Sequence, residues 1–562
     1  MTVESRLDAW SRGWRGPLLA ALIAMIAGLP GLLTVPPLDR DESRFAQATA
    51  QMLETGDFVN ISFQDQPRFK KPIGIHWLQA ISVAAFSEPA EREIWAYRIP
   101  SLLGAMLAAA ACAWGAAAFF GPRLGLFAGG LLGATFLLST EAFIAKTDAV
   151  LCGAITLSMA ALSHMYFAAR GGPPTSKRPW LLFWGGLALA TLVKGPVGPM
   201  AVVLTVAALW AWDREAGWLK NMRWGWGLIL FFAIVGPWAI AITVATDGAF
   251  WGAAVGGDLA PKLAGGHERH GGPFGYHLAM VSFLIFPATL LLPAALWRGW
   301  RDRIDPGVRF ALCWLIPTWL VFELLPTKLV HYTLPTYGAL AWLMAAAMRQ
   351  PIGRRLGLAG AVLSCLAAGV FAIVSIYALS EFGDGADVTW AALSAGLFVA
   401  AGLVGAFMIL RRAAASAVLT TGALGILAHA VFAGGLAPSL EPLWLSREVA
   451  EKLAETNLHP REGVTPGPVE VAGYAEPSLV FALGTSTGLG GASDAANAIA
   501  QGRPAVVESR EEPAFRRAMA ARHMRPYPAA RVKGLDYTNG DQMTLTVYRG
   551  VPQPPVTPDP LP

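Results

Sequence analysis

The sequence has little charge for its length. Only 14% of its 562 residues are Asp, Glu, Lys or Arg, whereas 54% are hydrophobic. Soluble globular proteins carry about 25% charged residues, so this composition excludes an ordinary soluble protein. The net charge of +5 is no nucleic-acid signature, because it arises when Lys and Arg collect in the cytoplasmic loops of a membrane protein. We therefore expect an all-α polytopic membrane protein with no nucleic-acid partner.

Cysteine is scarce, and two kinds of motif are missing. The four cysteines are Cys112, Cys152, Cys313 and Cys365. All lie in apolar runs, so we expect neither a disulfide framework nor a metal–cysteine site. There is no evident internal repeat. The glycine pairs at 256–257 and 265–266 lie in a loop without strand–turn–helix context, which excludes the usual phosphate-binding loop.

Long apolar runs dominate what is present. Residues 1–15 are polar and lead into an apolar run without a cleavage site, which predicts an uncleaved first span. A transmembrane helix needs about 20 apolar residues. The thirteen candidate spans are 17–36, 98–120, 124–144, 149–169, 180–196, 198–212, 224–246, 276–297, 309–325, 332–348, 356–380, 389–410 and 414–436. The shorter run 73–86 contains His76 and Gln79 and has the length of a re-entrant or interfacial segment.

The distribution of Lys and Arg between the spans decides the predicted membrane topology. If 73–86 does not span and the N-terminus is cytoplasmic, every cytoplasmic turn is basic, as the positive-inside rule requires. These turns carry Arg123; Arg170, Lys177 and Arg178; Arg214, Lys220 and Arg223; Arg298, Arg301 and Arg303; Arg349, Arg354 and Arg355; Arg411 and Arg412. Counting 73–86 as a span would put them on the wrong side. The pattern predicts thirteen spans and an extracytoplasmic C-terminus.

Five polar stretches from distant parts of the chain then emerge on the outer face. They are the loop 37–97, residues 146–148, residues 194–196, the loop 247–275 and residues 326–332. The charged run 40–44 could by itself be a solvated turn. Ionisable groups at a membrane boundary are costly, however, and five converging stretches indicate a functional site.

The composition changes near the C-terminal end. Residues 438–562 are polar, with strand patterns at 469–472, 505–508 and 543–548 and a helical pattern at 511–524. We expect a transmembrane domain over 1–437 and a small periplasmic α/β domain over 438–562. Its Pro-rich end is predicted to be disordered.

Asp41 and Asp148 are the carboxylates of this face that could carry chemistry. A carboxylate within hydrogen-bond reach of an acceptor hydroxyl or amine can serve as a general base. Two carboxylates could also bind a divalent cation. For Asp148, a cap on the helix that starts at Ala149 is an equal alternative. His267 and His270 have a spacing that could place metal ligands, although a solvated loop is the more frequent outcome.

Basic side chains gather on the same face. They are Arg44, Lys70, Lys71, Lys146, Lys194 and Lys328. Such a cluster suits a phosphate or pyrophosphate, although single lysines could contact lipid headgroups instead. His331 and Tyr332 could be interface anchors. Because extracytoplasmic space lacks nucleotides, a transferase there needs a donor that crosses the membrane, and a polyprenyl-phosphate sugar is one.

Several motifs resemble the aminoarabinose lipid A transferase family, which belongs to the GT-C glycosyltransferases and is related to the protein O-mannosyltransferases. The motifs are DESRFA at 41–46, MLETGDF at 52–58, FKKPI at 69–73, YRIPSLLG at 97–104, TDA at 147–149, KGP at 194–196, HGGPFGY at 270–276 and KLVHYTLP at 328–335. They follow the family order from residue 38 to 335.

The resemblance implies an inverting sugar transfer from undecaprenyl phosphate to an acceptor at the periplasmic face of the bacterial inner membrane. Asp41 would be the catalytic carboxylate and Asp148 would support the site. Arg44, Lys71 and Tyr332 would lie near the donor phosphate. Beyond what the resemblance implies, we expect donor phosphate or substrate binding also by Lys70, Arg98, Lys194, Lys328 and His331.

Two residues depart from the family pattern. The family often has Glu where this chain has Lys70, and that Glu is a metal ligand in some members together with a histidine matching His270. An ammonium has only donors and repels a cation, so no cofactor is certain and a divalent cation stays an alternative. Lys70 could itself supply the positive charge facing the phosphate. Phe45 stands where Tyr is usual, which removes one hydroxyl and could indicate a different sugar.

We thus expect a membrane glycosyltransferase that moves a sugar from an undecaprenyl-phosphate donor to lipid A, lipopolysaccharide or another envelope glycan. Membrane lipids would surround it. The alternatives are a protein O-glycosyltransferase of mannosyltransferase type and a transporter or flippase of lipid-linked sugars. Transporters place polar groups near the bilayer midplane, often in repeats, and this pattern is not seen here.

Overall fold

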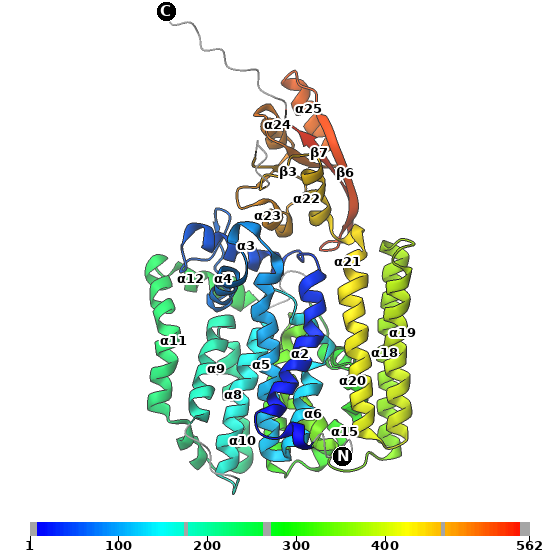
Figure 1. Ribbon diagram of the computed structural model, residues 1–562. Helices are drawn as coiled ribbons and strands as arrows, with labels where there is room; N and C mark the ends of the chain where they lie inside the picture. Colours follow the sequence, from blue (N-terminus) through cyan, green and yellow to red (C-terminus); the bar gives the residue numbers. More distant parts are fainter. Residues whose placement is uncertain (1–7, 173–177, 262–270, 462–466, 551–562) are drawn as a thin grey trace, which may run out of the picture.

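The computed structural model of the protein describes residues 8–172, 178–261, 271–461 and 467–550. A bundle of helices carries a small sheet domain on one end, and α2 (Arg15–Thr34) begins at the opposite end (Figure 1). In the described residues, eight helices are long and apolar enough to cross a membrane, or nine if one bent pair is a single span. The protein is therefore an all-α multi-pass membrane protein with a small C-terminal domain, as predicted.

The predicted spans coincide with helices of the bundle. The long helices are α2 (Arg15–Thr34), α5 (Ile94–Phe120), α8 (Asp148–Ala168), α11 (Trp224–Ala245), α16 (Pro306–Leu324), α18 (Arg354–Phe382), α19 (Val388–Leu410) and α20 (Ala414–Val431). Four further predicted spans fall on shorter helices, namely α6 (Pro122–Gly133) with α7 (Phe136–Glu141), α9 (Pro179–Lys194), α10 (Val197–Asp213) and α17 (Tyr337–Ala347). The number of membrane crossings stays a prediction.

One predicted span, 276–297, is broken. It consists of α14 (Tyr276–Leu284), η4 (Ala288–Leu291) and α15 (Leu292–Arg301), and the two arms meet at an angle of 116°. Pro287 lies at the break and lacks the N–H that a continuing helix needs. The run is apolar throughout, so hydropathy alone did not indicate the bend.

Small residues let the helices of the bundle approach closely. Gly104 of α5 faces α8, where a Cβ on this glycine would lie 2.6 Å from the backbone nitrogen of Val150. Such close contacts between small residues are typical of helix packing in membranes. They fix the start of α8, and hence Asp148, against α5.

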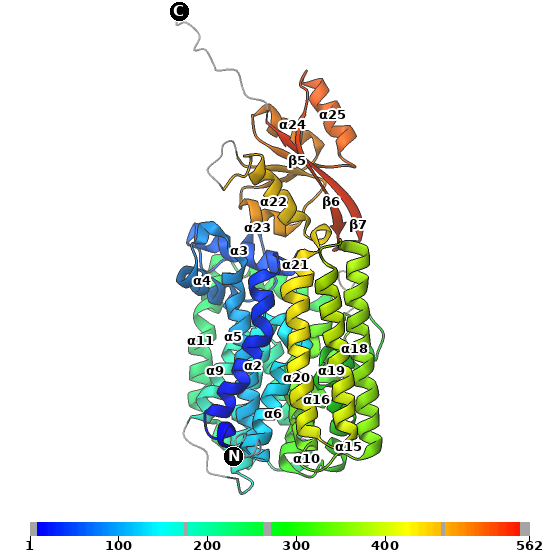
Figure 2. The same ribbon diagram turned by 45° about the vertical axis from the view of Figure 1, so that its right-hand side comes forward.

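Several short elements cover the end of the bundle that carries the sheet domain. After α2 come α3 (Asp41–Thr55), the hairpin of β1 (Ser62–Phe63) and β2 (Gln66–Pro67), and α4 (Gly74–Phe86), which corresponds to the run predicted not to span. Figures 1 and 2 both place α3 and α4 between the bundle and the sheet domain. The segments α12 (Ala249–Trp251), η3 (Gly252–Leu259) and η5 (Val330–Thr336) complete this end.

The C-terminal domain is built on a five-stranded sheet. Its strands are β3 (Glu470–Ala472), β4 (Gly488–Gly490), β5 (Ala505–Glu508), β6 (Tyr527–Asp536) and β7 (Asp541–Arg549), in the order β4-β3-β5-β7-β6. The β3 strand pairs in parallel with β4 and β5, whereas β7 pairs antiparallel with β5 and β6. Its helices are α22 (Leu445–Glu455), α23 (Pro477–Leu483), α24 (Ala492–Ala500) and α25 (Glu512–Ala521). The predicted strands appear as β3, β5 and β7, and the predicted helix as α25.

Candidate active site

A pocket rich in cations lies where the ends of α3, α8, α9 and η5 meet. We call it the cationic pocket, and its volume is about 290 Å³. It is lined by Asp39, Arg40, Asp41, Arg44, Phe45, Arg68, Lys70, Lys71, Lys146, Thr147, Asp148, Lys194, Thr327, Leu329, His331 and Tyr332. Seven of these side chains are Lys or Arg and three are Asp, which favours an anionic ligand.

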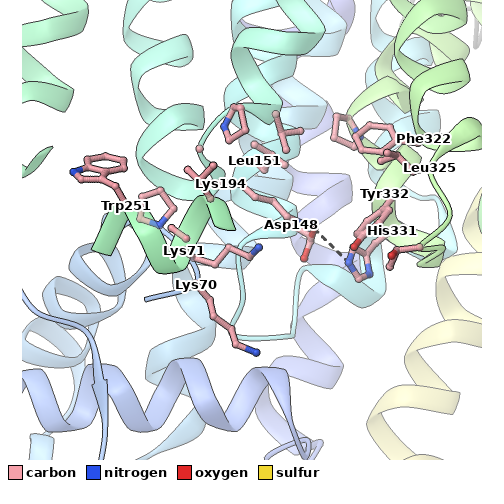
Figure 3. A pocket seen from close by; sticks show the side chains of 18 of the residues that line it. Lys70, Lys71, Asp148, Leu151, Lys194, Trp251, Phe322, Leu325, His331 and Tyr332 are labelled. Carbon is pink, nitrogen blue, oxygen red and sulfur yellow. Dashed lines mark hydrogen bonds and ion pairs between the residues drawn. The ribbon is translucent and has the colours of Figure 1, made fainter. Parts of the chain in front are cut away.

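An apolar groove of about 200 Å³ adjoins the cationic pocket. The two share seven lining residues, which are Lys70, Lys71, Asp148, Lys194, Thr327, His331 and Tyr332. Beyond this shared wall the groove is lined by apolar side chains such as Phe250, Trp251, Val255, Phe322 and Leu325 (Figure 3). The arrangement suits a molecule with an anionic head and an apolar tail.

Asp148 is the centre of a buried ion network. It is the first residue of α8, is 4% exposed and is approached from opposite sides by Lys194 and His331 (Figure 3). Lys194 Nζ donates to Asp148 Oδ1, and His331 Nε2 lies 3.7 Å from the same oxygen. Lys146 Nζ lies 3.8 Å from Oδ2. The N-cap of α8 is Thr147, which makes no side-chain cap bond, and the partners of the Asp148 carboxylate are the neighbouring bases.

Glu141 is a member of this network that the sequence analysis missed. Its Oε1 lies 3.0 Å from Lys146 Nζ and 3.8 Å from His331 Nδ1. Burial acts to lower the pKa of Lys146, but the charges of Glu141 and Asp148 outweigh it, so this pKa is raised and the lysine stays charged. A lone carboxylate inside the predicted span 124–144 was a signal that could have identified Glu141.

Asp41 differs from Asp148 in its surroundings. It is the first residue of α3, is exposed, and its carboxylate makes no hydrogen bond or ion pair with the residues that the structure describes. Its charge nevertheless helps to raise the pKa of Lys146. An open carboxylate inside a pocket of bases can accept a hydroxyl proton or orient a hydroxyl group.

The residue after Asp41 fixes the start of α3. Arg98 Nε and Nη2 each donate to one oxygen of Glu42 at 2.8 Å, and both side chains are fully buried. Arg98 also donates to the carbonyl oxygens of Val35 and Pro36. Arg98 therefore joins the end of α2 to α3 and lines neither the pocket nor the groove. Arg98 was predicted to contact the substrate, and its buried position outside both cavities does not support this prediction.

Lys328 is also turned away from the pocket. It is 5% exposed, and its Nζ donates to the carbonyl oxygens of Phe322 and Glu323 at the end of α16. A lysine at this position stabilises the last carbonyls of a helix. Its neighbour Thr327 lines both cavities instead.

The other predicted binding residues meet in the site. Arg44, Lys70, Lys71, Lys194, His331 and Tyr332 all line the cationic pocket. Lys194 Nζ lies 5.7 Å from the centre of the Tyr332 ring, a distance that allows a cation–π contact. The structure adds Arg40 and Arg68, and the Arg68 guanidinium lies 4.7 Å from the centre of the Phe45 ring. Phe45, the departure from the family pattern, is thus in the pocket wall.

Among the residues that the structure describes, the donor set around Lys70 does not fit a metal ion. Lys70 is exposed and lines both cavities, and its ammonium cannot ligate a cation. No group of three His, Cys, Asp or Glu side chains that could hold a metal occurs in the described residues. His270 lies outside the described residues, so the structure does not place the second predicted ligand.

Comparisons with known proteins agree with this architecture. Residues 70–240 match the sequence family described as dolichyl-phosphate-mannose-protein mannosyltransferase. Undecaprenyl phosphate-alpha-4-amino-4-deoxy-L-arabinose arabinosyl transferase of Aeromonas salmonicida is 29% identical over 55% of this chain and 57% of its own length. The protein of the same name from Pseudomonas aeruginosa strain PAO1 is 29% identical over 62% and 63%. These matches span less than two thirds of the relatives.

Solved structures extend the likeness to nearly the whole chain. The crystal structure of ArnT from Cupriavidus metallidurans in the apo state covers 95% of this chain and 98% of its own, with a TM-score of 0.74 and 20% identity. The structure of the same protein bound to undecaprenyl phosphate has a TM-score of 0.74 and 19% identity. The chain therefore has the ArnT fold, and its resemblance in sequence to the aminoarabinose transferases is confirmed.

Proposed function

We propose that the protein is an integral membrane glycosyltransferase that moves a sugar from an undecaprenyl-phosphate donor to lipid A, lipopolysaccharide or another envelope glycan. The observation that carries this proposal is the shared wall of the cationic pocket and the apolar groove, next to Asp41. A polyprenyl chain fits the groove, and the phosphate fits the bases of the shared wall. The structure of the ArnT relative bound to undecaprenyl phosphate supports this choice of donor.

The reaction is a single displacement with inversion at the anomeric carbon. The acceptor oxygen or nitrogen forms a bond to this carbon while the bond from the carbon to the phosphate oxygen breaks. Asp41 orients the acceptor group and takes its proton. Lys71, Lys194 and their neighbours stabilise the charge that develops on the leaving phosphate, which is how preorganised cations lower such a barrier. Asp148 holds Lys194 and His331 in place.

The same proposal sets the location of the protein. It would lie in the bacterial inner membrane with a cytoplasmic N-terminus, so that the site and the C-terminal domain face the periplasm. The basic turns at the opposite end of the bundle support this orientation. The domain division at residues 1–437 and 438–562 follows the change from apolar helices to the sheet domain.

A protein acceptor is the second candidate, because the sequence family matched at 70–240 is described by its action on protein. A flippase is the third candidate. The three make different products: a modified lipid or glycan, a glycoprotein, or a translocated donor without transfer.

The test is mass spectrometry of lipid A, glycolipids and glycoproteins from a deletion strain. We expect one sugar to be missing from a lipid and to be restored by the wild-type gene. Asp41→Asn should not restore it, since loss of a general base lowers the rate about 10²- to 10⁴-fold. Asp65→Asn is the matched control, because Asp65 is an exposed carboxylate of the same loop outside both cavities.

Each other outcome has a clear meaning. Full complementation by Asp41→Asn would refute the assignment of Asp41. A sugar missing from protein alone would favour the second candidate. A missing sugar together with donor that stays on the cytoplasmic side of the membrane, and no transfer by the purified protein, would favour the flippase.

A further inference from the structure

The sheet domain contacts the chain directly before Asp41. The backbone N–H of Asp39 donates to Tyr537 Oη at 2.7 Å, and Arg40 Nη2 donates to the carbonyl oxygen of Thr538 at 2.9 Å. Ser478 Oγ of α23 donates to Asp39 Oδ1. In Figure 1 the β6–β7 hairpin slants down from the sheet to the end of the helical bundle. We call these three contacts the hairpin latch.

The tip of this hairpin is held by its own hydrogen bonds. Asp536 Oδ1 accepts from the backbone N–H of Thr538 at 3.0 Å and from its Oγ1 at 2.6 Å. Asn539 Nδ2 donates to Asp536 Oδ2 at 3.0 Å. Thr538 Oγ1 also lies 2.9 Å from Glu476 Oε1, beside α23. Four short contacts make the tip a preformed element that can hold a partner at low entropic cost.

The segment that the latch holds has a strained backbone. Arg40 has φ +59° and ψ −106°, although it is not a glycine. A conformation of this kind is costly for a residue with a Cβ and persists only where surrounding contacts over-determine it. Here the contacts come from both sides, because the latch holds Asp39 and Arg40 while the buried Arg98 holds Glu42. Asp41 is the residue between them.

We propose that the hairpin latch positions Asp41 for the reaction, so that Tyr537 and Ser478 in the sheet domain are positioning residues of a site in the membrane domain. This inference rests on the proposed function of Asp41. It gives the sheet domain a role in the transfer itself. The latch acts by fixing the position of the Asp41 carboxylate.

Charge at Asp39 makes the latch sensitive to pH. Burial raises the pKa of the Asp39 carboxyl to about 7, against the hydrogen bond from Ser478, and the charges of Glu476 and Asp536 raise it further. Tyr474 and Tyr537 also face it, and Arg40 and Arg44 lie on its own side. Because the folded pKa is raised, the contribution to stability is complete below the ordinary value near 3.8 and is lost as the pH rises through about 7.

The experiment combines kinetics with hydrogen exchange on the full-length protein. Tyr537→Phe removes the acceptor of the Asp39 N–H, and Ser478→Ala removes the contact with the Asp39 carboxyl. We expect each variant to lower kcat about 10-fold with KM changed less than about two-fold, since small misplacements of a catalytic group are costly. Amides of residues 38–41 should exchange faster in both variants. Their effects should be less than additive because both contacts hold the same residue, Asp39.

The matched control is Tyr527→Phe, the same substitution at an exposed position at the far end of β6. It should leave kcat and the exchange of residues 38–41 unchanged. Protection of residues 38–41 in the wild type should fall between about pH 4 and pH 7, the range between the ordinary and the raised pKa of Asp39, and Asp39→Asn should remove this fall. Unchanged exchange over β5 and β7 shows that each variant is folded.

The outcomes separate the two proposals. An active wild type with wild-type kcat in Tyr537→Phe and Ser478→Ala would overturn the latch and leave the proposed function standing. Faster exchange without a loss of kcat would also overturn it, because the contact would then hold the domain without positioning Asp41. A wild type that transfers no sugar from any polyprenyl-phosphate donor overturns the proposed function and the latch with it.

Discussion

At the scale of single residues, two carboxylates of one pocket differ in their surroundings and therefore in the role that each can have. Asp148 is buried among Lys146, Lys194 and His331, and its charge is used to hold them. Asp41 stands exposed at the start of a helix without a partner among the described residues. Carboxylates whose environments differ in this way commonly divide their roles. The structure thus favours Asp41 for the acceptor and Asp148 for support.

Lys70 offers the clearest test at this scale. If its ammonium replaces a metal ion opposite the phosphate, Lys70→Ala should lower the transfer rate roughly 10-fold or more, because a charge facing the leaving group is lost. A chelator should leave the wild-type rate unchanged. Transfer assays with purified protein and donor lipid measure both effects.

Lys533→Ala is the control for this change, since Lys533 is exposed on β6, away from the site. Undiminished activity in Lys70→Ala, or loss of wild-type activity with a chelator, would contradict the role assigned to Lys70.

The sequence indicated most residues of the site but not their relations. Topology brought Asp41, Asp148, Lys194 and Tyr332 to one face, because each lies beside the end of a predicted span. The predicted topology could not show that Arg98 forms an ion pair with Glu42, since the partner of a buried cation depends on how the helices pack. Glu141 was missed for a similar reason, as it lies inside an apolar run and meets Lys146 only after the chain turns.

At the scale of elements, α3 depends on one buried ion pair. Glu42→Gln would leave the Arg98 guanidinium buried without its full countercharge, and breaking such a pair costs about 3–5 kcal/mol. We expect a clear fall in the melting temperature of the purified protein, measured by tryptophan fluorescence.

Glu93→Gln serves as the control, because Glu93 is exposed beside the start of α5. An unchanged melting temperature in Glu42→Gln would show that the ion pair does not hold α3 in place.

Helices and strands could be predicted where the sequence has a clear apolar run or a clear strand pattern. The apolar spans and the strands β3, β5 and β7 followed from hydropathy and residue type. The β6 strand did not, because Pro528, Gly534 and several charged residues break its pattern, and pairing with β7 along nine residues overrides these local preferences. The hairpin latch at the tip of the β6–β7 hairpin could therefore not be predicted from the sequence.

At the scale of the whole molecule, the fold predicts which parts face which side of the membrane. Ser493 is exposed in the sheet domain, and Glu215 is exposed in a turn after α10, at the opposite end (Figure 1). In spheroplasts, Ser493→Cys should react with a membrane-impermeant maleimide, whereas Glu215→Cys should react only after permeabilisation.

The wild type provides the background for this labelling. Cys112, Cys152 and Cys313 are buried and Cys365 is partly buried, so little reaction is expected without an added cysteine. Labelling of Glu215→Cys in intact spheroplasts would reverse the proposed orientation.

The shared wall between groove and pocket has a kinetic consequence for the proposed reaction. A donor that enters through the apolar groove diffuses in two dimensions and never leaves the bilayer, so the enzyme senses its mole fraction among the lipids. Diluting the donor with inert phospholipid would slow the reaction even at constant bulk concentration. The released carrier lipid would return to the same leaflet and compete for the same groove, so the rate of its removal would set the rate at which the membrane's outer surface is remodelled.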